Sequence, residues 1–305
     1  MRCRKCGERT VFSSPALCKD HFISAFEKKV YDTIDRYKLI SRGQRIAVAC
    51  SGGKDSTVLL HLLQKRGYDV TAMAIDEGIA GYRDKTLAFL RRFCFERGIP
   101  LQVHRYQDAF GASLDHMMQR SPRKPCTVCG VFRRYLLNRH ARDFDLLALG
   151  HNLDDEAQSI LMNLLLNNRA VLSRLGPKAG IVEAEGFTPR IKPLYLCREK
   201  EVMAYSFIQN LLTDFTECPN IVDSFRAEVR DFLNDHEASH PGFKELLVHE
   251  YLSSLPRLQR QAKDSGDLEP VGSCSLCREP SAAAVCRACS LKKEIRVSSP
   301  ERQGA

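Results

Sequence analysis

The chain has 305 residues, of which 44% are hydrophobic and 27% are charged, as is ordinary for a soluble globular protein with one sizeable core. Lys and Arg number 46 against 37 Asp and Glu, and the resulting net charge of +9 favours polyanionic partners, although a solvated basic surface would give the same count. No apolar run reaches the roughly 18 residues that a membrane-spanning helix needs. The basic N-terminus has no apolar segment after it, so we expect no secretory signal, no membrane partner and a cytoplasmic location.

A small cysteine-rich unit and a helix are predicted at the N-terminus. Cys3-x-x-Cys6 and Cys18-x-x-His21 lie within a short segment, and residues 22–37 then repeat apolar side chains at helical spacing. Between residues 45 and 167, strands are predicted over 45–50, 70–75, 101–106 and 146–149. Helices are predicted over 56–66, 83–97, 128–142 and 154–166. This alternation predicts an α/β fold whose parallel sheet is covered on both faces.

A glycine-rich loop joins the first predicted strand to the first helix after it, with the sequence Ser51-Gly52-Gly53-Lys54-Asp55-Ser56. The two glycines let the backbone approach an anion, and the helix N-terminus and Lys54 supply positive charge. The spacing differs from the Walker A pattern. A surface turn could carry the same letters, but the strand before it and the helix after it favour a phosphate site.

A second strand–helix junction carries Gly150-His151-Asn152-Leu153-Asp154-Asp155. The carboxyl ends of parallel strands share one edge of a sheet, so we expect the two junctions to meet there. Gly150 would let a nucleotide approach the backbone. Asp154 and Asp155 would hold magnesium or orient the reacting groups, unless they only stabilise the helix N-terminus.

The C-terminal part is predicted to be helical over 198–212 and 223–263, with a linker at 266–272, a second cysteine unit at 274–289 and a frayed end at 298–305. We expect four parts: an N-terminal zinc unit at 1–24, a catalytic domain at 25–220, a helical extension at 221–268 and a C-terminal zinc ribbon at 269–297.

Thirteen cysteines, an odd number, cannot all pair in disulfides, and most lie in C-x-x-C pairs, which in a cytosolic chain indicate metal ligands. Two pairs around a short loop can close a tetrahedral zinc site. One such site would use Cys3, Cys6, Cys18 and His21, and the other Cys274, Cys277, Cys286 and Cys289. Small zinc units of this kind also bind nucleic acids in other proteins.

The cysteines outside the two zinc units are Cys50, Cys94, Cys126, Cys129, Cys197 and Cys218. Cys50 and Cys94 have apolar neighbours and are expected to be buried thiols, and Cys197 stays unassigned. Cys126 and Cys129 lie at the start of a predicted helix, where the dipole favours thiolate. With Cys218 they would suit a [4Fe-4S] cluster with one open iron position. A redox disulfide, a shared zinc site or a persulfide are the alternatives.

The loop resembles the PP-loop of the ATP pyrophosphatase superfamily, and the whole set of motifs resembles the tRNA 2-thiouridine synthetases. The similarity includes both zinc units, S-G-G-K-D-S, C-x-x-C-G at residues 126–130, G-H-N-L-D-D at 150–155 and E-C-P-N at 217–220. Their order matches the form of the family with an N-terminal unit of three cysteines and one histidine.

The resemblance implies that Cys126, Cys129 and Cys218 bind a [4Fe-4S] cluster. It places ATP with magnesium against Ala49, Ser51, Gly52, Gly53, Lys54, Asp55, Ser56, Ile75, Gly150 and Asp155. The catalytic residues would be Lys54, Asp55, Arg133 and Asp155. Arg133 stands where the family often has lysine, and an arginine cannot serve as a proton-transfer base. The implied reaction adenylates the 2-oxygen of a tRNA uridine and replaces it with sulfur delivered through the cluster.

The implied partners are tRNA, a second copy of the chain in a homodimer, and a sulfur donor. That donor would be a ubiquitin-like thiocarboxylated protein, a persulfide or sulfide. Two other functions fit fewer of the motifs. A lysidine-type PP-loop ligase needs no cluster, and a zinc-dependent RNA-binding protein would carry an inactive ATP site. Wobble and T-loop uridines both remain open as targets.

Overall fold

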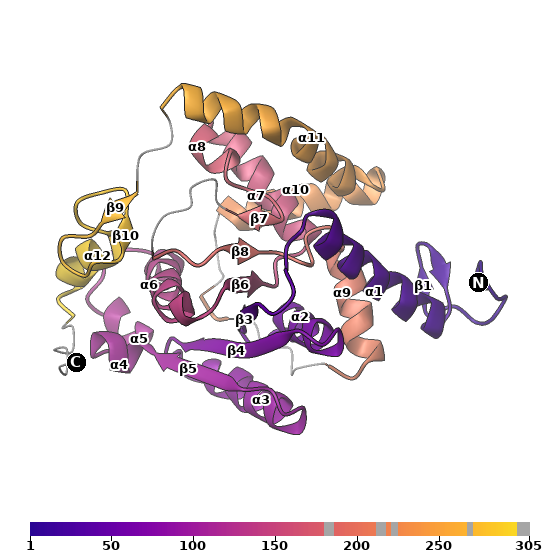
Figure 1. The fold of residues 1–305 in the computed structure, drawn as a ribbon, viewed down its shortest axis with the longest axis horizontal. Coiled ribbons are helices and arrows are strands. Elements are labelled where there is room, and N and C mark those ends of the chain that lie inside the picture. The colour runs from indigo at the N-terminus through magenta and orange to yellow at the C-terminus, as the bar shows by residue number, and fades with distance from the viewer. Residues whose placement is uncertain (180–185, 212–217, 221–224, 267–270, 298–305) are drawn as a thin grey trace.

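The computed structural model describes residues 1–179, 186–211, 218–220, 225–266 and 271–297. Its centre is a six-stranded sheet in the order β5-β4-β3-β6-β8-β7 (Figure 1). The strands are β3 (Arg45–Ala49), β4 (Asp69–Asp76), β5 (Leu101–Arg105), β6 (Leu146–Leu149), β7 (Lys178–Ala179) and β8 (Arg190–Ile191). Every neighbouring pair is parallel except β7 with β8, so the predicted α/β fold is confirmed.

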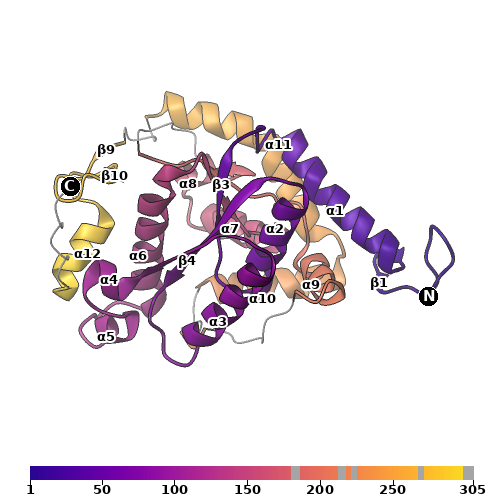
Figure 2. The same cartoon turned by 60° about the horizontal axis from the view of Figure 1, so that its bottom comes forward.

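Helices cover both faces of this sheet because successive strand residues point to opposite sides. On one face Ile46, Val48 and Ala148 belong to a core that also includes side chains of α1 (Lys19–Arg36), α2 (Lys54–Lys65), α3 (Arg83–Glu96) and α9 (Glu199–Ile208). On the other face Ala47 and Leu147 pack near the end of α6 (Pro125–His140) and η1 (Ala141–Asp143). Figure 2 shows α6 and α2 on opposite sides of β3 and β4.

Two further cores flank the sheet. One joins α6 to α4 (Tyr106–Phe110), α5 (Leu114–Met118) and the C-terminal unit, which contains β9 (Gly272–Ser273), β10 (Pro280–Ser281) and α12 (Arg287–Ile295). The other joins α7 (Leu153–Leu165), α8 (Arg169–Leu172), α10 (Phe225–Ser239) and α11 (Phe243–Asp264). The N-terminal unit, with β1 (Phe12–Ser13) and β2 (Ala16–Leu17), lies at the end of the molecule opposite the C-terminal unit (Figure 1).

The predicted strands and helices between residues 45 and 167 are all present, with small shifts at their ends. The largest shift is at α6, which begins at Pro125 rather than at residue 128. Proline fits the first helical position because its fixed φ is already helical and its missing N–H would have no partner there. This shift places both Cys126 and Cys129 at the N-terminal end of α6. The two-residue strands β7 and β8 and the short helices α4, α5 and α8 were not predicted, since they are too short for a periodic pattern.

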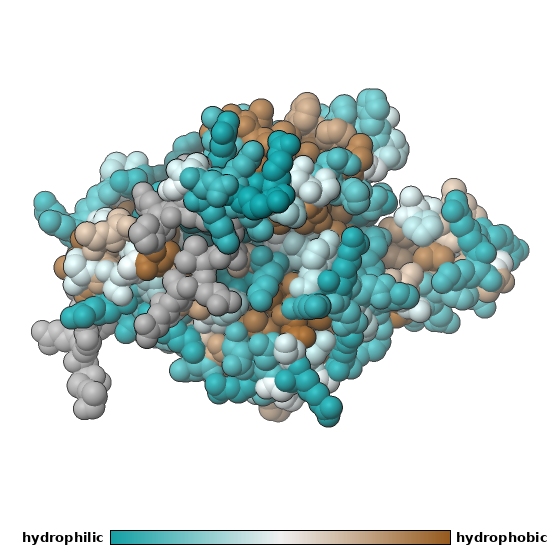
Figure 3. Space-filling model, turned by 45° about the horizontal axis from the view of Figure 1, so that its top comes forward, coloured by the Kyte–Doolittle hydropathy of each residue, from teal (hydrophilic) through white to brown (hydrophobic). Residues whose placement is uncertain are grey.

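The helix α1 runs unbroken from the N-terminal cysteine unit to the start of the sheet domain. The predicted boundaries at residues 24, 220 and 268 stay a prediction, and most of the predicted linker and the frayed end at 298–305 lie outside the described residues. None of the helices in the described ranges is long and apolar enough to cross a membrane. The face shown in Figure 3 is mainly hydrophilic, with apolar side chains in small separate patches.

Candidate active site at the carboxyl edge of the sheet

The glycine loop follows β3 and leads directly into α2, whose first residue is Lys54. Gly52 has φ of +83°, and a Cβ atom there would lie 2.6 Å from the backbone oxygen of Thr86, so only glycine fits. Ser51 Oγ accepts from the Gly53 N–H at 3.2 Å and lies 3.3 Å from Ser56 Oγ. These contacts hold the loop tightly around the N-terminus of α2, the geometry expected of an anion site.

The second junction, after β6, lies against the first, as predicted. A Cβ atom on Gly150 would come within 3.0 Å of the Ser56 backbone nitrogen, so a side chain would push the loops apart. Asn152 caps α7 by accepting from the N–H groups of Asp154 and Asp155, at 2.9 and 3.2 Å. Its amide nitrogen also donates to Asp55 Oδ1 at 2.9 Å. Asn152 therefore ties the two loops together, a role that the sequence did not reveal.

Asp155 lies where the two loops meet. The Asn152 N–H donates to Asp155 Oδ2 at 3.2 Å, which completes a capping box. Burial, together with the negative charge of Asp55, raises the pKa of Asp155 to about 6. Arg226, at 4.0 Å, opposes that shift. Asp155 is therefore a carboxyl group that can gain or lose a proton near neutral pH.

Lys54 is held at the loop by two carboxylates. Its Nζ lies 3.0 Å from Asp55 and 2.7 Å from Glu199, the first residue of α9. Burial disfavours the charge, but Asp55 and Glu199 outweigh it and raise the pKa of Lys54. The lysine is therefore cationic and oriented before a nucleotide arrives. Glu199 comes from a distant part of the chain and was not predicted.

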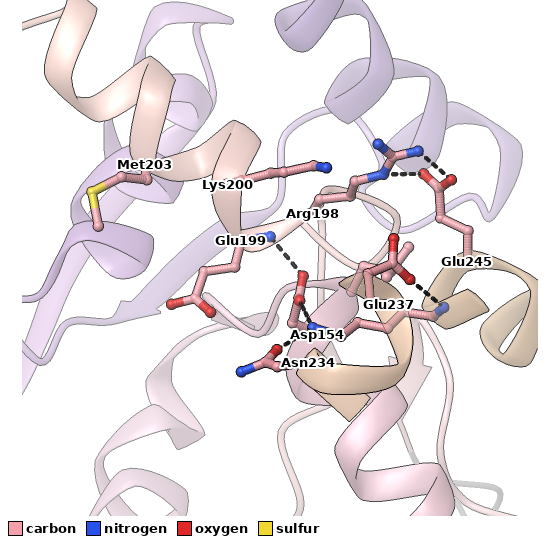
Figure 4. Close-up of a pocket in the computed structure, with 10 residues that line it drawn as sticks. Asp154, Arg198, Glu199, Lys200, Met203, Asn234, Glu237 and Glu245 are labelled. Atoms are coloured by element: carbon pink, nitrogen blue, oxygen red, sulfur yellow. Dashed lines mark hydrogen bonds and ion pairs between the residues drawn. The ribbon is translucent and has the colours of Figure 1, made fainter. Parts of the chain in front are cut away.

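A polar pocket of about 310 Å³ lies beyond Glu199, among the ends of α7, α9, α10 and α11 (Figure 4). Asp154 accepts there from the Glu199 N–H at 2.7 Å and from Lys244 Nζ at 2.6 Å. Both interactions are drawn in Figure 4, where Arg198 also clamps Glu245. In this structure Asp154 therefore anchors α9 and α11 on α7.

The three predicted cluster ligands, Cys126, Cys129 and Cys218, lie on the other side of the site. Cys126 Sγ donates to the backbone oxygen of Asn220 at 3.0 Å, which brings the segment after Cys218 to the first turn of α6. Burial raises the pKa of Cys129, as does nearby Cys218, while the Arg133 guanidinium opposes the shift. Within the described part of the chain, only the two terminal units bring three or more ligand atoms within 4.8 Å of one another. The sulfur atoms of Cys126, Cys129 and Cys218 are therefore less closely spaced than the ligand atoms of the terminal units.

Glu77, just after β4, connects the cysteine side to the nucleotide side. Its carboxylate is only 7% exposed and pairs with Arg83 at 3.1 Å and with Arg133 at 3.8 Å. Arg83 in turn donates to the Ser51 backbone oxygen in the glycine loop. Arg133 lies one helical turn after Cys129, so one buried acid links the predicted nucleotide loop to the predicted cluster site. Glu77 and Arg83 were missed because no local pattern marks them.

The two terminal units assemble as predicted. In the first, Cys18 Sγ lies 3.2 Å from His21 Nδ1 and 3.6 Å from Cys6 Sγ. In the second, Cys277 and Cys286 sulfurs lie 3.7 Å apart. Burial disfavours thiolate at Cys3 and Cys274, but backbone N–H donors prevail and lower the pKa of each to about 6. Each unit brings four ligand atoms within 4.8 Å of one another and could hold a metal ion.

Comparisons with known proteins agree with this site. The PP-loop domain family matches residues 22–236. The chain is 36% identical to the tRNA-5-methyluridine(54) 2-sulfurtransferase of Pyrococcus horikoshii over 99% of both proteins. It is 37% identical to the cytoplasmic tRNA 2-thiolation protein 1 of Anopheles gambiae, over 97% of this chain and 89% of that protein. Among solved structures, the U34-tRNA thiolase NcsA from Methanococcus maripaludis with its [4Fe-4S] cluster superimposes with a TM-score of 0.78, at 34% identity over 96% of both chains.

The raised pKa of Asp155 predicts a pH-dependent gain of stability when this carboxyl group is removed. The pKa of Asp155 is 3.8 in the unfolded chain and about 6 in the folded protein, so the folded protein holds this proton more tightly. Stability is therefore lost as the pH rises from 3.8 to about 6, and the full loss is present above that range. In nucleotide-free protein, Asp155→Asn should raise the free energy of unfolding more at pH 8 than at pH 5. Allowing for solvent screening, we expect a difference of about 1 kcal/mol by urea denaturation. An equal effect at both pH values would contradict the shifted pKa.

Proposed function

Because this chain belongs to the PP-loop family of tRNA 2-thiolation proteins, we propose that it is an ATP-dependent sulfurtransferase that converts a tRNA uridine to 2-thiouridine. The observation that carries the proposal is the link through Glu77. It joins a loop shaped for phosphates to α6, the helix that carries Cys126 and Cys129. Activation of an oxygen and delivery of sulfur can then occur in one site.

In the proposed reaction, the uridine is activated at the glycine loop and the junction at Gly150. The 2-oxygen is a poor leaving group, and transfer of AMP from ATP makes it a good one. The N-terminus of α2 and the cationic Lys54 would stabilise the charge on the transferring phosphate. Asp55 and Asp155, linked through Asn152, are the carboxylates that would hold magnesium. The adenosine would lie against Ala49, Ile75 and Gly150, where β3, β4 and β6 end.

The cysteine side fits an iron–sulfur cluster. Two thiols lie one turn apart at the N-terminus of α6, and Cys218 packs against the same core as Cys129, which supports the proposal. A [4Fe-4S] cluster on Cys126, Cys129 and Cys218 would keep a sulfur atom deprotonated near neutral pH. Arg133 would offset the negative charge of three thiolates, but it cannot accept a proton.

The terminal units are proposed to bind one zinc ion each, since four closely spaced thiol or imidazole ligands suit tetrahedral zinc. The proposal also includes a cytoplasmic location, which agrees with the names of the insect relatives. The sulfur donor, the homodimer and the target uridine stay predictions, because the relatives in the comparison act on different positions. Mass spectrometry of tRNA nucleosides from a deletion strain, with position mapping, tests the function and identifies the target.

Loss of one cluster cysteine should separate delivery of sulfur from activation. Cys218→Ser, purified without oxygen, should lose most of its iron and sulfide and lower thiolation of tRNA at least ~100-fold. Binding of ATP, measured by calorimetry, should be unchanged because the glycine loop is untouched. If this variant kept its iron and thiolated tRNA normally, the assignment of Cys218 would be wrong.

Loss of one N-terminal ligand should affect zinc alone. Cys6→Ser should reduce zinc from two ions per chain to one by elemental analysis, because three remaining ligands hold zinc weakly. Its iron content should match that of the unaltered protein, since the N-terminal unit lies at the far end of the molecule from α6 (Figure 1). Retention of two zinc ions would contradict the proposed site.

A further inference from the structure

Three arginines that lie near one another form what we term the arginine surface: Arg134, Arg190 and Arg287. They come from α6, from β8 and from the start of α12. Arg134 and Arg287 are exposed, and Arg190 is partly exposed. In the described ranges, no carboxylate lies within ion-pair distance of any of the three. Just beyond α6 the situation differs, since Arg142 of η1 is paired with Glu279 at 2.7 Å.

Arg134 lies against the backbone of Gly130, near the N-terminal end of α6. A Cβ atom on Gly130 would lie 3.3 Å from both terminal nitrogens of the Arg134 guanidinium. Gly130 follows Cys129, so the guanidinium is next to the backbone of a predicted cluster ligand. Glycine at this position leaves room for the arginine to lie flat on the helix.

Arg190 is brought to the same region by strand register. It pairs with Leu147 in the parallel β6–β8 ladder, and its neighbour Ile191 points into the core on the opposite face. Leu147 packs with Ala141, so Arg190 projects on the side of the sheet that α6 covers. The guanidinium of Arg190 therefore points toward α6, the helix that carries Cys126 and Cys129.

The cations act on one another. Burial lowers the pKa of Arg134, and the charges of Arg133 and Arg287 lower it further. Burial and the charge of Arg134 likewise lower the pKa of Arg190. Arginine remains protonated at any physiological pH, so the protein bears this repulsion continuously. Bound anions would relieve it.

We infer that Arg134 and Arg190, with Arg287 beside them, bind backbone phosphates of the tRNA next to the uridine that enters the site. The inference rests on the proposed function. Guanidinium groups suit this task because they bind phosphate oxygens in a bidentate manner. A target base that leaves its stack needs its flanking phosphates held, and Arg134 lies against Gly130, next to the proposed cluster ligand Cys129.

The phosphates of ATP are the other source of the same chemistry, and the geometry disfavours them. The glycine loop and Lys54 already provide a phosphate site at α2. Arg134 and Arg287 lie instead on α6 and the C-terminal unit, beyond the Glu77 bridge from that loop. The test therefore measures tRNA binding and ATP binding separately.

The test compares Arg134→Ala, Arg190→Ala and the double variant with Arg91→Ala, an exposed arginine on α3, as the matched control. Binding of unmodified substrate tRNA to the metal-loaded full chain would be measured by filter binding at several salt concentrations. We expect each site variant to weaken binding roughly tenfold, the loss typical of a charge-assisted hydrogen bond. The slope of log affinity against log salt should shrink by about one for each phosphate that the variant no longer binds. Arg134→Lys should keep the slope and recover only part of the affinity.

The outcomes separate the inference from the proposed function. If the Arg134 and Arg190 variants had the same affinity for tRNA and the same salt slope as Arg91→Ala, the inference would be overturned, provided that the unaltered protein binds and thiolates tRNA. Weaker ATP binding with unchanged tRNA binding would also overturn it and assign the arginines to the nucleotide. Failure of the unaltered protein to bind any tRNA would overturn the proposed function itself. Thermal melting checks that each variant is folded, and relief of repulsion should leave the melting temperature unchanged or higher.

Discussion

The site depends on one buried carboxylate. Glu77 sits between Arg83, which supports the glycine loop, and Arg133, which follows Cys129 on α6. Burying an ionised carboxylate costs free energy unless cations and hydrogen bonds compensate it. The positions of its partners Arg83 and Arg133 are therefore fixed closely. The same confinement sets the distance between the nucleotide loop and the cysteine helix. The glycine loop and the cysteines of α6 are thereby held in a fixed position relative to each other.

Much of the fold and of the site could be predicted because the relevant signals are local. The alternation of apolar runs with helical segments predicts the parallel sheet, and parallel strands necessarily gather their following loops at one edge. The glycine loop and the junction at Gly150 therefore meet, as the backbone contact between Gly150 and Ser56 confirms. The C-x-x-C and C-x-x-H spacings likewise identified the two terminal ligand sets, because each pair is close in sequence as well as in space.

The residues that escaped prediction act across long sequence distances. Asn152 reaches Asp55, Glu199 reaches Lys54, and Glu77 reaches both Arg83 and Arg133. Each belongs to a common residue type with no distinctive spacing, so only the folded chain reveals its partner. Arg190 is harder still to predict, because its strand has only two residues. The side of the sheet to which its side chain points follows only from the register of that strand with β6. The charge of +9 indicated a basic protein but not where the unpaired cations lie.

The helix α6 has a consequence that extends beyond the thiols it carries. Its N-terminal end holds Cys126 and Cys129, while near its other end Asn138 lies 3.3 Å from Glu279 of the C-terminal unit. Lys292 of the same unit sits over the ring of Tyr135 on this helix. A rigid rod fastened at one end transmits displacement to the other. A shift of the C-terminal unit against Asn138 and Tyr135 would therefore be passed along α6 to the turn that carries Cys126.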